Sequence, residues 1–330
     1  MEFLHAQIMG KPMWAWGAFI AIVLVLLIID LGVLHRKARA IGVRESLWMS
    51  AFYIAVALLF GAWVWREFGS QRGSEYLTGF LIEKTLAVDN IFIISLIFTY
   101  FAIPAASQHR VLFWGILGVI VLRAIMIALG AALVAQFAWV LYVFAAFLIA
   151  TGAKMLVIGD KLPNLENNPI LKLLRRTMRI TPDLHQQRFI VMRPDPLTGK
   201  RVLWVTPLFV ALVMIEVVDL IFAVDSVPAI FAITTDPFIV YTSNIFAILG
   251  LRALYFALAV VIARFKYLKQ ALALVLVFIG SKIFVADMMG WDKFPASVSL
   301  GVTLALIAGG VLYSLWRTAQ QDARTGGRAS

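Results

Sequence analysis

The chain has 330 residues, of which 62% are hydrophobic and 14% are charged, and its formal net charge is +11. Soluble domains carry about 45–50% apolar and about 25% charged residues, so this composition predicts a polytopic membrane protein. The chain contains no cysteine, which excludes disulfides, thiolate metal ligands and thiol catalysis. The positive charge falls in predicted connections, and therefore indicates topology rather than nucleic-acid binding.

Nine stretches are long and apolar enough to cross a bilayer, which takes about 20 apolar residues. In chain order they are 13–34, 46–65, 76–101, 110–133, 137–158, 206–232, 239–262, 268–288 and 295–316. We therefore expect an all-α polytopic membrane protein with about nine transmembrane helices in a single domain, residues 1–330. The first stretch differs from a signal peptide, because its apolar run is too long and its basic residues follow it.

Lysine and arginine concentrate in alternate connections, which marks those connections as cytoplasmic. This places the N-terminus outside and the C-terminus inside. The largest basic connection is the cytoplasmic loop 159–205, in which residues 170–179 could form an amphipathic helix at the lipid surface. A linker that fixes topology is the simpler interpretation of this loop. Residues 317–330 form a cytoplasmic tail, and we expect it to be disordered from Gln320 onwards.

Three segments recur in the same order in the two halves of the chain. LAVDNIFII (86–94) matches FAVDSVPAI (222–230), and two further pairs follow in the later spans. Spans 3–5 (repeat 1, 76–158) thus correspond to spans 6–8 (repeat 2, 206–288), with opposite orientation in the membrane. Inverted repeats are typical of secondary transporters, whose ion site lies near the bilayer midplane.

Five acidic residues lie inside the spans that begin the two repeats. A charged side chain at bilayer depth costs about 2.5–3.5 kcal/mol on insertion scales, so these acids indicate a functional site. Carboxylate, amide and hydroxyl oxygens suit hard cations such as Mg²⁺, Ca²⁺ and Mn²⁺. All four histidines fall in predicted tails or loops, so a histidine site within the membrane is not expected. The candidate metal ligands are Glu83, Asp89, Asn90, Glu216, Asp219, Asp225 and Ser226.

The alternative is that these acids only neutralise buried bases. The candidates for such charge pairing are Arg123, Lys154, Arg252 and Lys282. We hypothesise that a base occupies the site when the metal is absent, which would supply one of the two states needed for alternating access. On this hypothesis Lys282→Met would alter metal release rather than folding. We also expect Asp89 and Asp225 to approach each other, aided by a helix break near Pro228.

Three motifs are similar to those of a known family. EKTLAVDN (83–90), the long stretch from EVVDLIFAVDSVP to LGLRALYF (216–256) and VFIGSKIF (277–284) resemble the TerC/Alx family of bacterial inner-membrane proteins. The resemblance runs from about residue 13 to residue 316. It maps the acidic membrane residues of the family onto Glu83, Asp89, Glu216, Asp219 and Asp225. It also implies Mn²⁺ as the cation and export as the direction, neither of which follows from residue spacing.

The predicted function is therefore secondary transport, in which a divalent cation moves from cytoplasm to periplasm across the bacterial inner membrane. We expect no catalytic residues, no permanently bound cofactor and no nucleic-acid partner, and no Walker motif points to ATP. Proton antiport is a reasonable coupling, because carboxylates can exchange a metal ion for protons. The alternatives are a membrane factor for tellurium resistance or redox modulation, or a partner in the metallation or insertion of other proteins that docks at 159–205.

Overall fold

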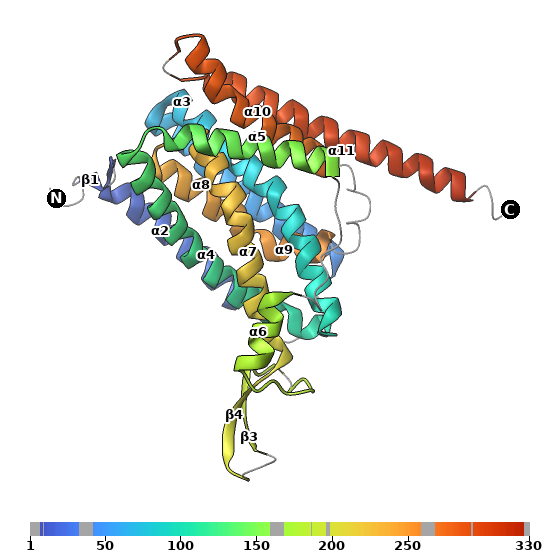
Figure 1. Cartoon of the computed structure of the whole chain (residues 1–330). Helices are drawn as coiled ribbons and strands as arrows, with labels where there is room; N and C mark the ends of the chain where they lie inside the picture. The colour runs from blue at the N-terminus through green and yellow to red at the C-terminus, as the bar shows by residue number, and fades with distance from the viewer. Residues whose placement is uncertain are drawn as a thin grey trace.

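The computed structural model describes residues 7–8, 10–32, 42–158, 168–185, 187–195, 199–258, 268–291 and 293–326. Most of these residues are helical (Figure 1). The helices are α2 (Met13–Gly32), α3 (Val43–Tyr100), α4 (Ala105–Gln136), α5 (Val140–Ile158), α6 (Pro169–Thr177), α7 (Pro207–Phe231), α8 (Pro237–Leu249), α9 (Leu251–Leu258), α10 (Leu268–Met288) and α11 (Ala296–Gly326). Two antiparallel strand pairs complete the described chain: β1 (Gln7–Ile8) with β2 (Lys11–Pro12), and β3 (Ile190–Pro194) with β4 (Arg201–Val205).

The helices have the length and composition of a polytopic membrane protein. Six described helices can each cross a bilayer, and the bent pair α8–α9 makes a seventh if it is counted as one span. The apolar part of α2, Met13–Ile29, is shorter. The all-α membrane class is therefore confirmed, whereas the count of nine spans and their orientation stay predictions.

Helix α3 contains two of the predicted spans and folds back on itself at Gly69. Gly69 has φ 89° and ψ 168°, a backbone conformation that is open essentially to glycine alone. Across the reversal, the Tyr76 hydroxyl donates a hydrogen bond to the Ala57 carbonyl oxygen at 3.0 Å. In a straight helix, residues so far apart in sequence would be separated by roughly 28 Å. The two halves of α3 therefore pack against each other.

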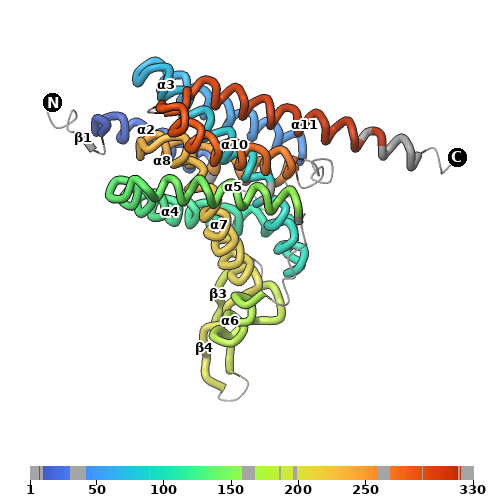
Figure 2. Tube along the Cα trace, turned by 45° about the horizontal axis from the view of Figure 1, so that its top comes forward, coloured from blue at the N-terminus to red at the C-terminus, as the bar shows by residue number. Residues whose placement is uncertain are grey.

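Helices of the first half of the chain pack against helices of the second half: α3 contacts α8 and α9, α4 contacts α7, and α5 contacts α10. Helices α5, α10 and α11 lie side by side in both views (Figures 1 and 2). A Cβ added to Gly152 would lie 2.6 Å from the Ala273 carbonyl oxygen, and a Cβ added to Gly280 would lie 2.6 Å from the Ala145 carbonyl oxygen. Ala273 lies seven residues before Gly280, and Ala145 lies seven residues before Gly152, so the two contacts are equivalent. Such reciprocity is expected of two repeats related by a two-fold axis.

The predicted helix break at Pro228 is wrong. Helix α7 continues through Pro228 to Phe231, and only three helical residues follow the proline, so the turns that carry Asp219 and Asp225 lie before it. A break occurs instead in the predicted span 239–262, where α8 and α9 meet at Gly250 with a bend of 41°.

The described residues between α5 and α7 form a short helix and a hairpin. The predicted basic helix is present as α6, and the Asn168 side chain caps it by accepting a hydrogen bond from the Ile170 N–H at 2.9 Å. The sequence analysis did not anticipate the β3–β4 hairpin, which projects from the bundle together with α6 (Figure 1). The expected disorder from Gln320 is also wrong over most of its length, because α11 extends to Gly326.

Candidate functional site: an acidic cluster around Arg123

Arg123 of α4 lies at the centre of a buried polar cluster, and only 1% of its surface is exposed. Its guanidinium binds Asp219 of α7 with two hydrogen bonds, Nε to Oδ2 at 3.2 Å and Nη2 to Oδ1 at 3.0 Å. The same guanidinium forms an ion pair with Glu83 of α3. Glu83 and Asp219 occupy matching positions in the two sequence repeats, so one arginine joins the two halves of the protein.

Neutral side chains complete the coordination of this guanidinium. Arg123 Nη1 donates hydrogen bonds to Ser226 Oγ at 3.0 Å and to Asn244 Oδ1 at 2.8 Å. The Asn90 amide donates to Asp219 Oδ1 at 3.3 Å. These three side chains are almost fully buried. The cluster therefore gathers oxygen-bearing side chains from α3, α7 and α8 around one cation, as a metal ion would.

Glu216 adds a third carboxylate next to this cluster. It lies three residues before Asp219 on α7, and the two carboxylates repel each other. The Glu216 carboxylate packs against Gly118 of α4, where any side chain would collide with it. Its Oε2 is buried and has no hydrogen-bond partner among the described residues. A buried carboxylate oxygen without a donor is costly, so this position favours a cation or a proton.

Asp89 and Asp225, which hold matching positions in the two repeats, were expected to approach each other, and the structure does not test this expectation. The side chain of Asp89 lies outside the described part of the structure. Asp225 is half-buried and faces α5, where Thr151 Oγ1 donates a hydrogen bond to it at 3.5 Å and Lys154 acts on it electrostatically. Asp225 is therefore oriented towards α5 in this state. Nothing in the sequence singled out Thr151.

The described contacts of the other predicted bases lead away from Arg123. Lys282 donates a hydrogen bond to Ser299 Oγ at 3.1 Å and interacts electrostatically with Glu75. Arg252 is buried on α9. Lys84, next to Glu83 in sequence, donates instead to the Ala247 carbonyl oxygen at 3.0 Å, near the break between α8 and α9. Among the predicted charge-pairing residues, Arg123 is thus the one whose described contacts include the central acids.

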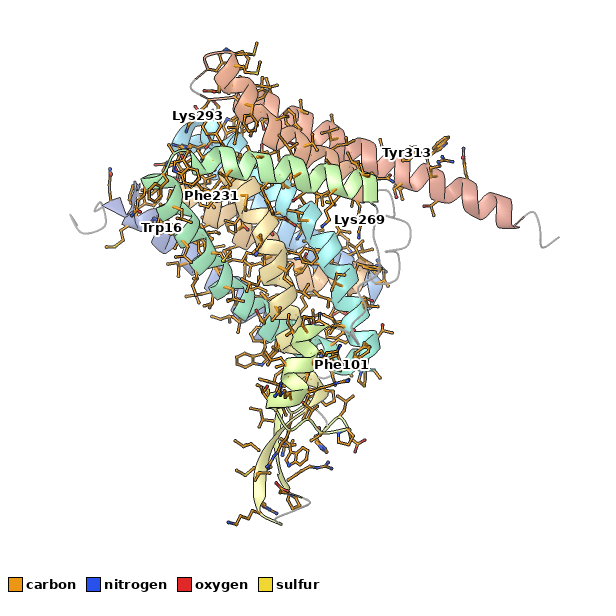
Figure 3. The ribbon with its side chains drawn as sticks, in the orientation of Figure 1. Trp16, Phe101, Phe231, Lys269, Lys293 and Tyr313 are labelled. Atoms are coloured by element: carbon orange, nitrogen blue, oxygen red, sulfur yellow. The ribbon has the colours of Figure 1, made fainter. Side chains whose placement is uncertain are left out.

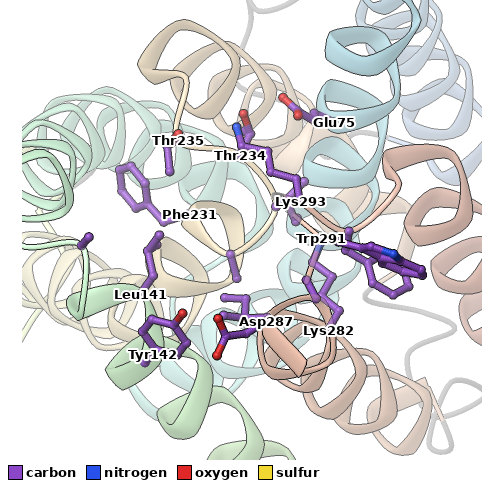
Figure 4. Close-up of a pocket in the computed structure, with 16 residues that line it drawn as sticks. Glu75, Leu141, Tyr142, Phe231, Thr234, Thr235, Lys282, Asp287, Trp291 and Lys293 are labelled. Atoms are coloured by element: carbon purple, nitrogen blue, oxygen red, sulfur yellow. The ribbon is translucent and has the colours of Figure 1, made fainter. Parts of the chain in front are cut away.

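A pocket of about 280 Å³ opens beyond the C-terminal end of α7 (Figure 4). Phe231 lies at that end of the bundle, close to the connection that carries Lys293, whereas Phe101 lies at the opposite end (Figure 3). Glu75, Lys282 and Asp287 are among the residues that line the pocket. On the predicted orientation this is the outer side. The pocket has equal numbers of acidic and basic side chains and is separate from the Arg123 cluster.

The described acids do not form a ready-made metal site. Within the described ranges, no group of three or more His, Cys, Asp or Glu side chains could hold a metal ion together. Glu83 and Asp219 face Arg123, while Glu216 and Asp225 point to neighbouring helices. A metal could therefore bind these acids only after Arg123 moves. The role of the predicted ligands stays a proposal.

Comparison with known proteins shows the family. Residues 68–322 match the model of the integral membrane protein TerC family. The chain belongs to the TerC family. A protein from Rickettsia felis, named only as an uncharacterised membrane protein, is 48% identical over 92% of this chain and 98% of its own. The Escherichia coli K12 protein Alx, provisionally described as a membrane-bound redox modulator, is 42% identical over 96% of this chain and 99% of its own. No solved structure matches.

Proposed function

We propose that this TerC family member is a secondary transporter that exports a divalent cation, with Mn²⁺ the first candidate, across the bacterial inner membrane. The observation that carries the proposal is the charge of the Arg123 cluster. Glu83 and Asp219 pair with one guanidinium, and Glu216 lies beside Asp219, so three carboxylates share one positive charge when all of them are ionised. The cluster then lacks two positive charges, which one divalent cation or two protons would supply.

The cost of this imbalance makes a structural role a poor explanation. Each uncompensated charge at bilayer depth costs about 2.5–3.5 kcal/mol on insertion scales. A pure scaffold could place apolar side chains at these positions at no such cost. A site that exchanges a divalent cation for protons, in contrast, needs a stable excess of carboxylate. Two of the three carboxylates, Glu83 and Asp219, lie at matching positions of the two predicted inverted repeats, which is where transporters of this architecture bind their ions.

Arg123 defines the state of the carrier without metal. Its guanidinium occupies the space between Glu83 and Asp219 and holds the oxygens that a cation would bind. Entry of the metal requires the guanidinium to move away, and Glu216, with its unpaired oxygen, is the carboxylate placed to attract the incoming cation. Protonation of the acids after release would restore neutrality and allow Arg123 to return. Export thereby becomes coupled to protons moving the opposite way.

The test is Mn²⁺ flux in proteoliposomes that contain the purified full-length protein. Wild type should transport Mn²⁺ down its gradient, and flux should respond to an imposed pH gradient. Asp219→Asn removes one charge from the cluster and should reduce flux to the level of empty vesicles. Asp183→Asn, which changes an exposed acid in the loop before β3, is the matched control and should transport normally. Equal flux in both variants would overturn the proposal.

Redox modulation is the second candidate, because it is the activity in the name of the Alx relatives. This chain has no cysteine, so thiol–disulfide exchange by its own side chains is excluded. A redox effect would then follow indirectly from altered metal content. Flux that is absent in proteoliposomes, with a redox phenotype retained by Asp219→Asn in cells, would favour this candidate.

A further inference from the structure

The β3–β4 hairpin has one exposed face that is mainly apolar. In the pairing register Ile190 opposes Val205, and Met192 opposes Leu203, so these four side chains share a face. Ile190, Met192 and Leu203 are 49%, 65% and 63% exposed. The alternate residues, including Val191 on the other face, are half-buried. An isolated two-stranded hairpin with an open apolar face is marginally stable in water.

Basic residues surround this face. Arg201 shares the face and opposes Pro194, and Lys200 precedes it at the exposed tip. The described residues between 168 and 205 include eight Lys or Arg and two Asp. One of these acids, Asp195, is already paired with Arg179 at 2.7 Å. The hairpin thus combines exposed apolar side chains with a surplus of positive charge.

The hairpin is held firmly beside the start of a membrane helix. Only Thr206 separates β4 from α7, and its hydroxyl donates a hydrogen bond to the Arg188 carbonyl oxygen at 2.7 Å. Arg110 of α4 stacks over the Phe189 ring, with its guanidinium carbon 5.2 Å from the ring centre. In both views the hairpin projects from the bundle beyond the N-terminal end of α7 (Figures 1 and 2). The base of its apolar face, at Ile190 and Val205, is therefore next to the start of α7, a helix long and apolar enough to cross a membrane.

We propose that the exposed face of the hairpin binds the anionic phospholipid surface of the membrane. Ile190, Met192 and Leu203 enter the boundary between headgroups and acyl chains, and Lys200 and Arg201 contact headgroup phosphates. Basic amphipathic elements bind such surfaces through buried apolar area and electrostatic attraction together. Lipid is favoured over an acidic protein because the face lies one residue from a membrane-spanning helix. This inference does not depend on the transported ion.

The absence of cysteine makes the experiment direct, because each introduced thiol is unique. Met192→Cys places a fluorophore on the exposed face, and Val191→Cys places it on the opposite face of the same strand. Both variants are reconstituted in vesicles of phosphatidylcholine, with or without phosphatidylglycerol. Some of the phosphatidylcholine carries a nitroxide on its acyl chain, which quenches only fluorophores at the membrane. Iodide in the buffer reports access to water.

In vesicles with phosphatidylglycerol, the label at 192 should be quenched by nitroxide several-fold more strongly than the label at 191, and should be protected from iodide. The difference should fall in pure phosphatidylcholine and when Lys200→Gln and Arg201→Gln are combined with Met192→Cys. Equal nitroxide quenching at both positions would overturn the proposal. So would a label at 192 that iodide reaches in both lipid mixtures, which would leave the face to an acidic protein partner.

Discussion

Arg123 links an acid of each repeat through a single side chain. Its double hydrogen bond to Asp219 is the geometry in which arginine binds a carboxylate most strongly. Removing one member of a buried ion pair leaves an uncompensated charge and costs about 3–5 kcal/mol. A metal that binds the same acids should supply the missing charge.

Arg123→Met should therefore lower the melting temperature in detergent without metal, and Mn²⁺ should restore more of that stability than it adds to wild type. The matched control is Arg176→Met, which removes an exposed arginine of α6 outside the predicted spans. Surface substitutions usually change stability by less than about 0.5 kcal/mol, so the control should melt near wild type and show no added response to Mn²⁺. The same Mn²⁺-induced shift in Arg123→Met and wild type would contradict a shared site.

For single residues, the sequence predicts which side chains belong to the site better than it predicts which side chains contact one another. The repeat alignment identified Glu83 and Asp219 as equivalent, and the charge-pairing hypothesis named Arg123 among four bases. The charge-pairing hypothesis could not say whether Arg123 or Lys282 meets the acids, because the rotation of each helix about its axis depends on packing between distant segments. Lys282 donates to Ser299, and the hypothesis that it affects metal release stays a prediction.

Among the elements, α5 and α10 bring the backbones of the two repeats into close contact. Their backbones meet at Gly152 and Gly280, where the position of a Cβ is taken by a carbonyl oxygen of the other helix. Small residues at helix interfaces allow such approach in membranes, where packing rather than hydrophobic exclusion drives association. Helix α7 contacts this pair, in part through the hydrogen bond between Thr151 of α5 and Asp225.

Gly152→Ala should destabilise the protein by roughly 1–3 kcal/mol, the usual cost of overpacking a tight contact. Gly301→Ala in α11 is the control, because no atom lies within 4 Å of its added Cβ. It should be neutral or stabilising by up to about 1 kcal/mol, from improved helix propensity. Unfolding in mixed micelles measures both, and equal stability of the two variants would show that the close approach of α5 and α10 is not required.

The helix ends could be predicted where a run of apolar residues has clear limits. They could not be predicted where the backbone conformation of single residues determines the turn of the chain. The ends of α7 and α10 lie within a residue of the predicted spans. The reversal at Gly69 falls in the connection expected between spans 2 and 3, but α3 has no break in its helical pattern except that glycine. The β3–β4 hairpin was missed because its strands are short and lie in a segment rich in proline and arginine.

For the whole molecule, the predicted orientation has a direct test in the cysteine-free chain. Met289→Cys follows α10 and is 59% exposed in wild type, and Lys200→Cys lies at the exposed tip of the hairpin. With the N-terminus outside, a membrane-impermeant maleimide should label residue 289 in intact cells, and label residue 200 only after permeabilisation. The reverse pattern would invert the topology and with it the direction of export.

The central claim is that the acids around Arg123 bind a divalent cation, and Mn²⁺ binding measured by electron paramagnetic resonance tests it most directly. The free-ion signal should fall as purified wild-type protein is added. Asp219→Asn should bind far less Mn²⁺, whereas Asp183→Asn should bind as wild type does. Undiminished binding by Asp219→Asn and by Glu83→Gln would contradict the account.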